Sequence, residues 1–343
     1  MPTATEFFGI TITNFGPLTT TYTPPPSCTA GTTDHLLYAI SNATTILHGA
    51  PTCDRDPIGD CVPEGSSYDA LTTKILNPWD LGFLNYHSPG VHCPKGWTTA
   101  AVLENGDGAA SEVKSGVFTN TDTQFETPSD PDSPSVLGPN EIWPKLLEPS
   151  ETLVYCCPSG WTPNVWGVCI TSIESLDPAK YTGICVRDYS DSFPDWKAVH
   201  TVEGEPVSNT AGVISGVFFT GTWTEKVDKL TDFLEGDSYT STLVVVKTLP
   251  AVALVHHLSD LEATAFSTAD VKETETGGSD GEDKTEEVGE NGSAASNLSK
   301  AAGLAPVVAV LAGFVIGAGL LAPCRDPDKL RDYSMHDFVE VLA

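Results

Sequence analysis

Short runs of apolar and β-branched residues follow one another between residues 31 and 269, and turns containing Gly or Pro separate them. Runs of this kind, bounded by turn residues, are typical of β-strands. The pattern predicts strands over Trp97–Leu103, Val113–Thr119, Thr152–Cys157, Gly167–Ile173, Tyr181–Arg187, Ala211–Thr220, Tyr239–Leu249 and Ala251–His257. A helical spacing occurs over Glu225–Leu234, where Val227, Leu230, Phe233 and Leu234 share one face. We therefore expect residues 31–269 to form a mainly β domain with long loops.

Two polar segments adjoin these runs. Residues 1–30 are rich in Thr and Pro, and they predict an extended N-terminal segment that Cys28 attaches to the domain. Thr119–Pro139 is also polar and rich in Pro, and we interpret it as a long surface loop between two cysteine-containing parts of the chain.

Gly303–Ala322 is a run of twenty residues without a charged or strongly polar side chain. A helix of this length measures about 30 Å, which matches the hydrocarbon core of a bilayer. Residues 303–322 therefore predict a transmembrane helix whose partner is the lipid bilayer. Basic residues are more frequent just after the span, at Arg325, Lys329 and Arg331. The positive-inside rule then predicts a short cytoplasmic tail at 323–343 and places the bulk of the chain outside the plasma membrane.

The predicted span has two further features. Ala305, Ala309, Gly313 and Gly317 recur every four residues, a spacing on which two helices pack closely as a homodimer; alternatively, small residues are simply frequent in membrane spans. Cys324, directly after the span, is a candidate for S-acylation or an ordinary reduced thiol.

The segment before the span, residues 270–302, is strongly acidic. Eight acidic residues and one Lys lie between Glu273 and Glu290, with no aromatic side chain. Such a composition cannot bury enough apolar surface to offset the entropy of ordering, so it predicts a disordered juxtamembrane stalk.

The net charge of the whole chain is −29, from 17 Lys+Arg and 46 Asp+Glu. A surface this negative repels phosphate backbones, so nucleic acid is not an expected partner.

Eight of the nine cysteines lie between residues 28 and 185. An even number confined to one region is typical of a disulfide framework in an oxidising compartment. The eight are Cys28, Cys53, Cys61, Cys93, Cys156, Cys157, Cys169 and Cys185. The sequence does not choose among their pairings, although the adjacent Cys156 and Cys157 should bond to different partners because a ring between neighbours is strained.

C-x2-C, the cysteine spacing of zinc sites, does not occur in the chain, and the one H-x3-5-H spacing, from His87 to His92, has no such cysteine pair to complete it. His256 and His257 are adjacent and would point to opposite faces of a strand, and His92 next to Cys93 is a poor chelating pair. We therefore expect neither a metal site nor a cofactor. Three N-x-[ST] sequons predict glycosylation at Asn42, Asn291 and Asn297, all on the side expected to be outside.

One phrase recurs: Cys93-Pro-Lys-Gly-Trp97-Thr98 returns as Cys157-Pro-Ser-Gly-Trp161-Thr162. Pro and Gly after a cysteine favour a tight turn, and the Trp would cover the nearby disulfide. The first interpretation is a structural turn used twice. The second makes Trp97 and Trp161 stacking platforms for a sugar ring.

These phrases carry a resemblance to a known family. Leu18–Cys28, Tyr86–Trp97 and Tyr155–Trp161 resemble a group of fungal single-pass surface proteins that often carry the label LPXTG-domain-containing. The resemblance spans about residues 17–260 and the hydrophobic span. It implies a cysteine-rich ectodomain, one C-terminal transmembrane helix and a short inner tail, and no established catalytic activity. The chain departs from the pattern because it lacks a recognisable signal peptide and the L-P-x-T-G motif, so we expect its natural start to lie upstream of Met1.

No H-E-x-x-H helix, P-loop or G-x-G-x-x-G fingerprint occurs. The one G-x-S-x-G match, Gly277–Gly281, lies in the polar acidic segment without the apolar strand that a nucleophile elbow follows, so no catalytic residue is predicted. The leading hypothesis is a non-catalytic cell-surface protein that binds wall polysaccharide or another surface protein. One alternative is a membrane-anchored extracellular hydrolase. Another is a surface sensor that signals through Tyr333 or Ser334 of the tail.

Overall fold

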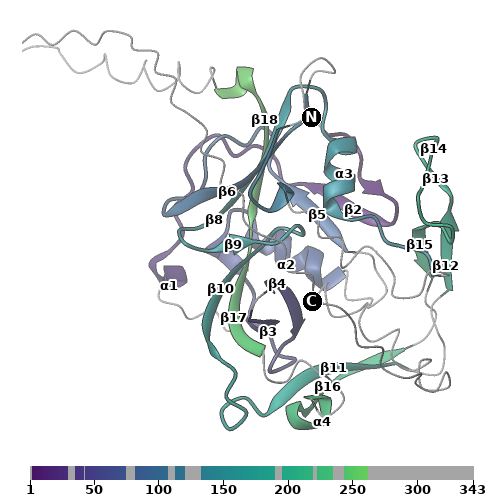
Figure 1. Ribbon diagram of the computed structural model, residues 1–343. Helices are drawn as coiled ribbons and strands as arrows, with labels where there is room; N and C mark the ends of the chain where they lie inside the picture. Colours follow the sequence, from purple (N-terminus) through teal and green to yellow (C-terminus); the bar gives the residue numbers. More distant parts are fainter. Residues whose placement is uncertain are drawn as a thin grey trace, which may run out of the picture.

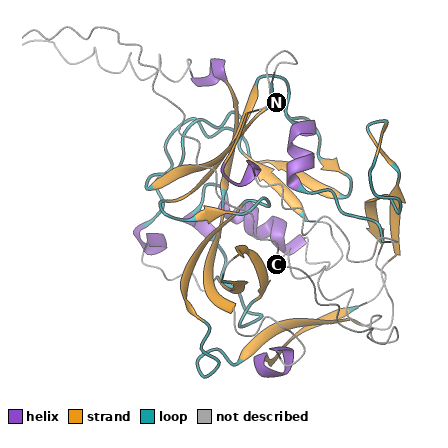
Figure 2. Cartoon of the chain, viewed as in Figure 1, coloured by secondary structure: helices purple, strands orange, loops and turns teal. Residues whose placement is uncertain are grey.

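The computed structural model describes residues 2–29, 35–41, 43–74, 82–106, 113–119, 133–189, 195–218, 222–234 and 243–261. These residues are mainly β, as the short runs between turns predict, with a few short helices (Figure 2). Within this part of the chain, no helix is long and apolar enough to cross a membrane. The residues predicted to form the acidic stalk (270–302), the transmembrane helix (303–322) and the tail (323–343) lie outside the described residues.

An antiparallel sheet in the order β18–β8–β6–β7 forms the upper part of the molecule (Figure 1). Its strands are β18 (Val252–His257), β8 (Glu151–Pro158), β6 (Trp97–Glu104) and β7 (Val113–Ser115). A parallel bridge between His87 and Leu254 connects β18 to a smaller sheet, in the order β1–β2–β5. The strands of that sheet are β1 (Glu6–Phe7), β2 (Ile10–Asn14) and β5 (Phe83–Tyr86). Val252–Val255 is apolar without alternation because both faces of β18 are covered: Ala253 and Val255 belong to one apolar cluster, and Val252 and Leu254 to another.

A second large sheet has the order β4–β3–β17–β10–β9. Its strands are β4 (Ala43–Gly49), β3 (Leu36–Ile40), β17 (Leu243–Pro250), β10 (Val168–Ser175) and β9 (Thr162–Pro163). β17 leads through Ala251 directly into β18, so one stretch of chain, green in Figure 1, belongs to both large sheets.

The remaining strands form three two-stranded ribbons, and the helices are short. The ribbons are β11 (Gly183–Tyr189) with β16 (Trp223–Lys229), β12 (Asp195–Val199) with β15 (Val213–Phe218), and β13 (Thr201–Val202) with β14 (Glu205–Pro206). The helices are α1 (Pro26–Thr29), α2 (Gly65–Lys74), α3 (Pro139–Leu146) and α4 (Leu230–Leu234), with 3-10 turns η1 (Gly59–Cys61) and η2 (Gly116–Thr119).

The main core lies between the upper sheet, the small sheet and α3. Trp143 of α3 is fully buried, and its indole Nε1 donates a hydrogen bond to the hydroxyl of Tyr155 at 2.8 Å. The Tyr86 ring meets the Trp143 ring edge-on, at 6.0 Å between centroids. An indole buried with its N–H satisfied contributes packing without the penalty of an unpaired donor.

Four disulfides join the eight cysteines, and the prediction that Cys156 and Cys157 have different partners is confirmed. The bonds are Cys28–Cys61, Cys53–Cys185, Cys93–Cys156 and Cys157–Cys169. Cys28–Cys61 attaches the N-terminal segment to η1, as expected of the first cysteine. Cys157–Cys169 joins β8 of one large sheet to β10 of the other.

The helix predicted over Glu225–Leu234 is wrong in its first half. Residues 225–229 belong to β16, which pairs with β11 from Trp223↔Tyr189 to Lys229↔Gly183, and α4 begins at Leu230. Val227, expected on the apolar helix face, is 53% exposed, whereas Leu230 is buried. The backbone hydrogen bonds of a distant strand override the local spacing here.

Three other segments differ from their predictions. The end of the expected surface loop Thr119–Pro139 is buried: Leu137 is in the core, and Pro139 begins helix α3, which the sequence did not predict. Val113–Thr119 is a strand only up to Ser115, because Gly116 turns the chain with a φ of 62° into η2. The extended N-terminal segment contains β1 and β2, whose Ile10 is fully buried.

Buried His87 makes the stability of this fold sensitive to acid. Its side chain is 4% exposed beside Phe15, and burial lowers its pKa below the ordinary value of 6.5, against the opposing effects of a backbone hydrogen bond with Gly16 and the charge of Glu64. The folded chain keeps the ring neutral while the unfolded chain takes up a proton. The contribution of the neutral His87 ring to the free energy of unfolding is therefore complete above about pH 6.5 and is lost as the pH falls toward the folded-state pKa.

We expect the free energy of unfolding of the full-length chain, from urea titrations with the disulfides intact, to fall between about pH 7.5 and pH 5.5. The fall should be smaller in His87→Gln, which removes the titrating ring and keeps an N–H donor. His92→Gln is the matched control, since His92 is exposed, and should behave as the natural chain. An unchanged pH dependence in His87→Gln would contradict this assignment.

Candidate functional site

The repeated Cys-Pro-x-Gly-Trp phrase forms the same turn twice. The backbone N–H of Trp97 donates to the Pro94 carbonyl at 3.0 Å, and the backbone N–H of Trp161 donates to the Pro158 carbonyl at 3.0 Å. The third residue of each turn is a glycine with positive φ, 84° at Gly96 and 85° at Gly160. A positive φ at this position is the signature of a type II turn, which explains why both copies carry Gly there.

The two turns lie side by side. Trp97, the first residue of β6, is the register partner of Pro158, the last residue of β8. The first turn therefore ends where β6 begins, and the second turn starts beside it, where β8 ends. Ser159 joins them: its N–H and its hydroxyl both donate to the carbonyl of Gly96, at 3.3 and 3.1 Å. The Ser159 hydroxyl is therefore part of the turn structure, as its place in the turn suggests.

Each turn begins next to a disulfide. Cys93, before the first turn, bonds to Cys156, and Cys157, before the second, bonds to Cys169. A disulfide thus fixes the start of each turn, in addition to the pairing of β6 with β8. We call Pro94–Trp97 and Pro158–Trp161 together the twin turns.

The twin turns bring together the two aromatic residues that the sequence singled out. Trp97 and Trp161 are both half-buried and pack against the main core, and Trp97 also contacts the apolar cluster around Cys93 and Cys156. Part of each indole is therefore covered and part is open to solvent. This packing supports the structural interpretation, and the open part leaves room for the stacking interpretation.

A third tryptophan lies nearby, and the sequence analysis did not single it out. Trp166 is half-buried against the same core and sits between β9 and β10, where the Gly167 N–H donates to Asn164 and the Val168 N–H donates to the Asn164 side chain. It follows Trp161 by five residues on the same hairpin. That recurrence of Trp around a short turn is the signal that could have indicated it.

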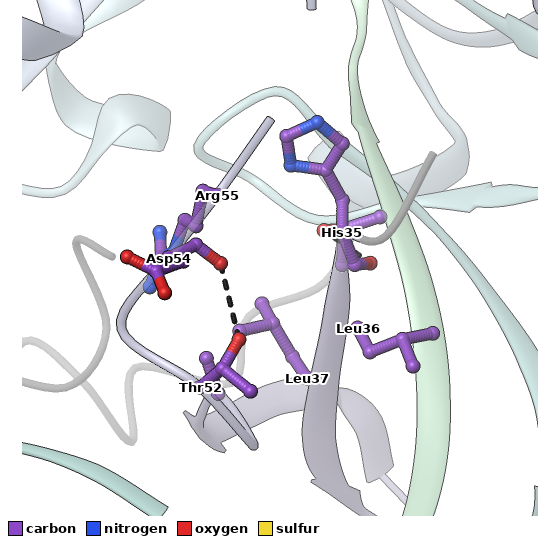
Figure 3. A pocket seen from close by; sticks show the side chains of 8 residues that line it. His35, Leu36, Leu37, Thr52, Asp54 and Arg55 are labelled. Carbon is purple, nitrogen blue, oxygen red and sulfur yellow. Dashed lines mark hydrogen bonds between the residues drawn. The ribbon is translucent and has the colours of Figure 1, made fainter. Parts of the chain in front are cut away.

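Two small hollows indent the described part of the molecule elsewhere. The first, about 30 Å³, lies beside β3 between His35, Thr52 and Arg55, and the Thr52 hydroxyl donates to the Asp54 carbonyl at 3.0 Å (Figure 3). The second, about 10 Å³, lies between Tyr68 and His87. Sites that enclose a small molecule measure roughly 300–1,000 Å³. Neither hollow could enclose a sugar ring, so we regard the surface at the twin turns as the better candidate site.

The other residues with predicted roles are not on this surface. Asn42, Asn291, Asn297 and Cys324 lie outside the described residues, although Ser41, directly before the first sequon, is exposed at the end of β3. The cysteines near histidine or glutamate, Cys93 and Cys53, are bound in disulfides and offer no thiolate to a metal.

Comparison with family models, curated proteins and solved structures found no match to this chain.

The twin turns depend on their glycines. We expect Gly96→Ala and Gly160→Ala each to lower the free energy of unfolding by about 1–2 kcal/mol, because an L side chain is disfavoured at positive φ although the space around both glycines is open. Gly216→Ala on β15 is the control: its surroundings are also open, its φ is not positive, and Ala should be neutral or slightly stabilising. Equal effects at all three positions, by urea unfolding, would show that the turn conformation is not the cause.

Proposed function

We propose that this chain is a single-pass membrane protein of the cell surface whose disulfide-bonded ectodomain binds wall polysaccharide at the twin turns. Residues 303–322 form the membrane anchor, residues 270–302 the acidic stalk and residues 323–343 the cytoplasmic tail. The family resemblance of the cysteine phrases supports this topology. The four disulfides support it as well, because such bonds persist in oxidising compartments such as the cell exterior.

The observation that carries the binding proposal is the placement of Trp97 and Trp161 on neighbouring turns of identical form. Aromatic rings offer large, rigid contact areas, and a ring held in place loses little entropy when a ligand stacks on it. Two disulfides and the Ser159–Gly96 hydrogen bonds hold these turns before any ligand arrives. A polysaccharide presents a repeating series of sugar rings, and one indole on each of two neighbouring turns offers a stacking surface for it.

The charge of the chain narrows the ligand class. With a net charge of −29, the protein repels anionic polymers. The twin turns themselves carry one charged side chain, the exposed Lys95, and otherwise offer apolar rings, the Ser159 hydroxyl and backbone groups. We therefore favour a neutral wall polysaccharide over an acidic one.

The test measures retention of the full-length chain, solubilised in detergent, on insoluble neutral polysaccharides such as β-glucan and chitin. Trp161→Leu and Trp97→Leu keep apolar volume and remove the flat indole. Each should weaken retention by about twofold to tenfold, the loss expected for one aromatic contact.

Trp196→Leu is the matched control, since Trp196 is 38% exposed on β12, away from the twin turns. It should bind as the natural chain does. The proposal fails if the natural chain is not retained on any neutral polysaccharide, or if the three variants lose retention equally.

A further inference from the structure

A cluster of two glutamates and one histidine lies at the end of β8 opposite the twin turns. Glu151 begins β8, His257 ends β18, and the two are register partners across the sheet. Glu148 precedes β8 by three residues in the turn that follows α3. The sequence predicted no metal site, because ligand-spacing rules do not join residues so far apart in the chain, and His257 was considered only as the neighbour of His256.

The three side chains converge on a small common volume. His257 Nε2 is 3.6 Å from Glu151 Oε1 and 3.9 Å from Glu148 Oε2, and the three atoms lie within 4.8 Å of one another. These separations exceed the roughly 2.7–3.2 Å of a hydrogen bond. They approach the edge of a tetrahedron around a zinc ion, about 3.3–3.6 Å for ligand distances of 2.0–2.2 Å.

The backbone fixes the ligand positions. The Glu151 N–H donates to the Glu148 carbonyl at 3.0 Å, and the Glu148 N–H donates to Glu151 Oε2 at 2.8 Å, which directs Oε1 toward His257. The backbone N–H of His257 donates a hydrogen bond to Asp260 Oδ2 at 2.8 Å. Ligand residues that are held by such hydrogen bonds lose little conformational freedom when an ion binds.

Charge favours a divalent cation at this place. The Glu151 side chain is fully buried, and a second carboxylate, Glu148, lies beside it. A buried carboxylate is costly without a compensating charge, and two carboxylates together repel each other. A protonated imidazole supplies one positive charge, whereas a divalent ion supplies two and accepts all three donors as ligands.

We propose that Glu148, Glu151 and His257 bind a divalent transition-metal ion of the zinc class. Imidazole with carboxylates suits zinc-like ions, whereas Ca²⁺ and Mg²⁺ prefer oxygen ligands alone. Glu148 and His257 are partly exposed, so solvent can supply the fourth ligand of a tetrahedral site. A second group of potential ligands, Cys53, Cys185 and Glu225, does not compete, because the two sulfurs are bonded to each other.

The test is calorimetric titration of Zn²⁺ into the full-length chain in detergent, after removal of metal with EDTA and with the disulfides intact. The natural chain should bind one ion tightly, and Co²⁺ in its place should give the absorption of a tetrahedral N/O site. Glu148→Gln and His257→Gln should each weaken this binding by about tenfold or more. Glu151→Gln is not used, because its carboxylate also accepts the Glu148 backbone hydrogen bond and its loss would affect folding.

The controls are Glu205→Gln and His92→Gln, which change exposed residues outside the cluster and should leave the affinity unchanged. An equal unfolding midpoint in EDTA for every variant shows that the fold is retained. The proposal is overturned if His257→Gln and Glu148→Gln bind Zn²⁺ as tightly as the natural chain does. It is equally overturned if the natural chain binds Zn²⁺ no more tightly than the double variant Glu148→Gln/His257→Gln does.

Discussion

The fold depends on the two adjacent cysteines of β8. Successive side chains of a strand point to opposite faces, so Cys156 and Cys157 leave β8 in opposite directions. Cys156 bonds to Cys93 on the approach to β6, and Cys157 bonds to Cys169 on β10 of the other large sheet. Both cysteines are fully buried. β8 is therefore fixed from both faces, and the disulfides also restrict the unfolded chain, since they close loops of 63 and 12 residues.

This constraint places both candidate sites on one rigid element. The twin turns lie at the C-terminal end of β8, and Glu151 lies at its first residue. A strand of eight residues is about 23 Å long between its first and last Cα atoms, so the two sites are well separated. The strand pairing with β6 orients one site and the pairing with β18 orients the other. A ligand at one end thus leaves the other end accessible.

The sequence predicts those features of the fold that local pattern and covalent chemistry determine. Short apolar and β-branched runs between turns indicate β6, β8, β10 and β18, and the strain of a ring between neighbours separates the partners of Cys156 and Cys157. The misassigned helix shows the limit of this approach. The spacing of Val227 and Leu230 fits a helix, but the pairing partner of β16 is β11, some forty residues earlier, and no local pattern contains that information.

One of the two candidate sites could be predicted from a local motif, whereas the other depends on strand pairing between distant parts of the chain. The Cys-Pro-x-Gly-Trp repeat is local, so Trp97 and Trp161 were identifiable from the sequence. Glu151 and His257 are more than a hundred residues apart and meet only through the register of β8 and β18, which a metal-ligand spacing rule cannot detect. Helix α3 was missed because Pro144 inside it disfavours a helix by propensity, although Pro139 occupies the first helical position, where Pro is tolerated, and the apolar face fills the core.

The central claim is that oppositely directed disulfides from Cys156 and Cys157 fix β8, and mass spectrometry of the unreduced protein tests it most directly. Cleavage with a non-specific protease, followed by fragmentation that breaks S–S bonds, separates the partners of the two adjacent cysteines. The account predicts the pairs Cys93–Cys156 and Cys157–Cys169, with no alkylation of these four cysteines before reduction. The exchanged pairs Cys93–Cys157 and Cys156–Cys169, or free thiols at these positions, would contradict it.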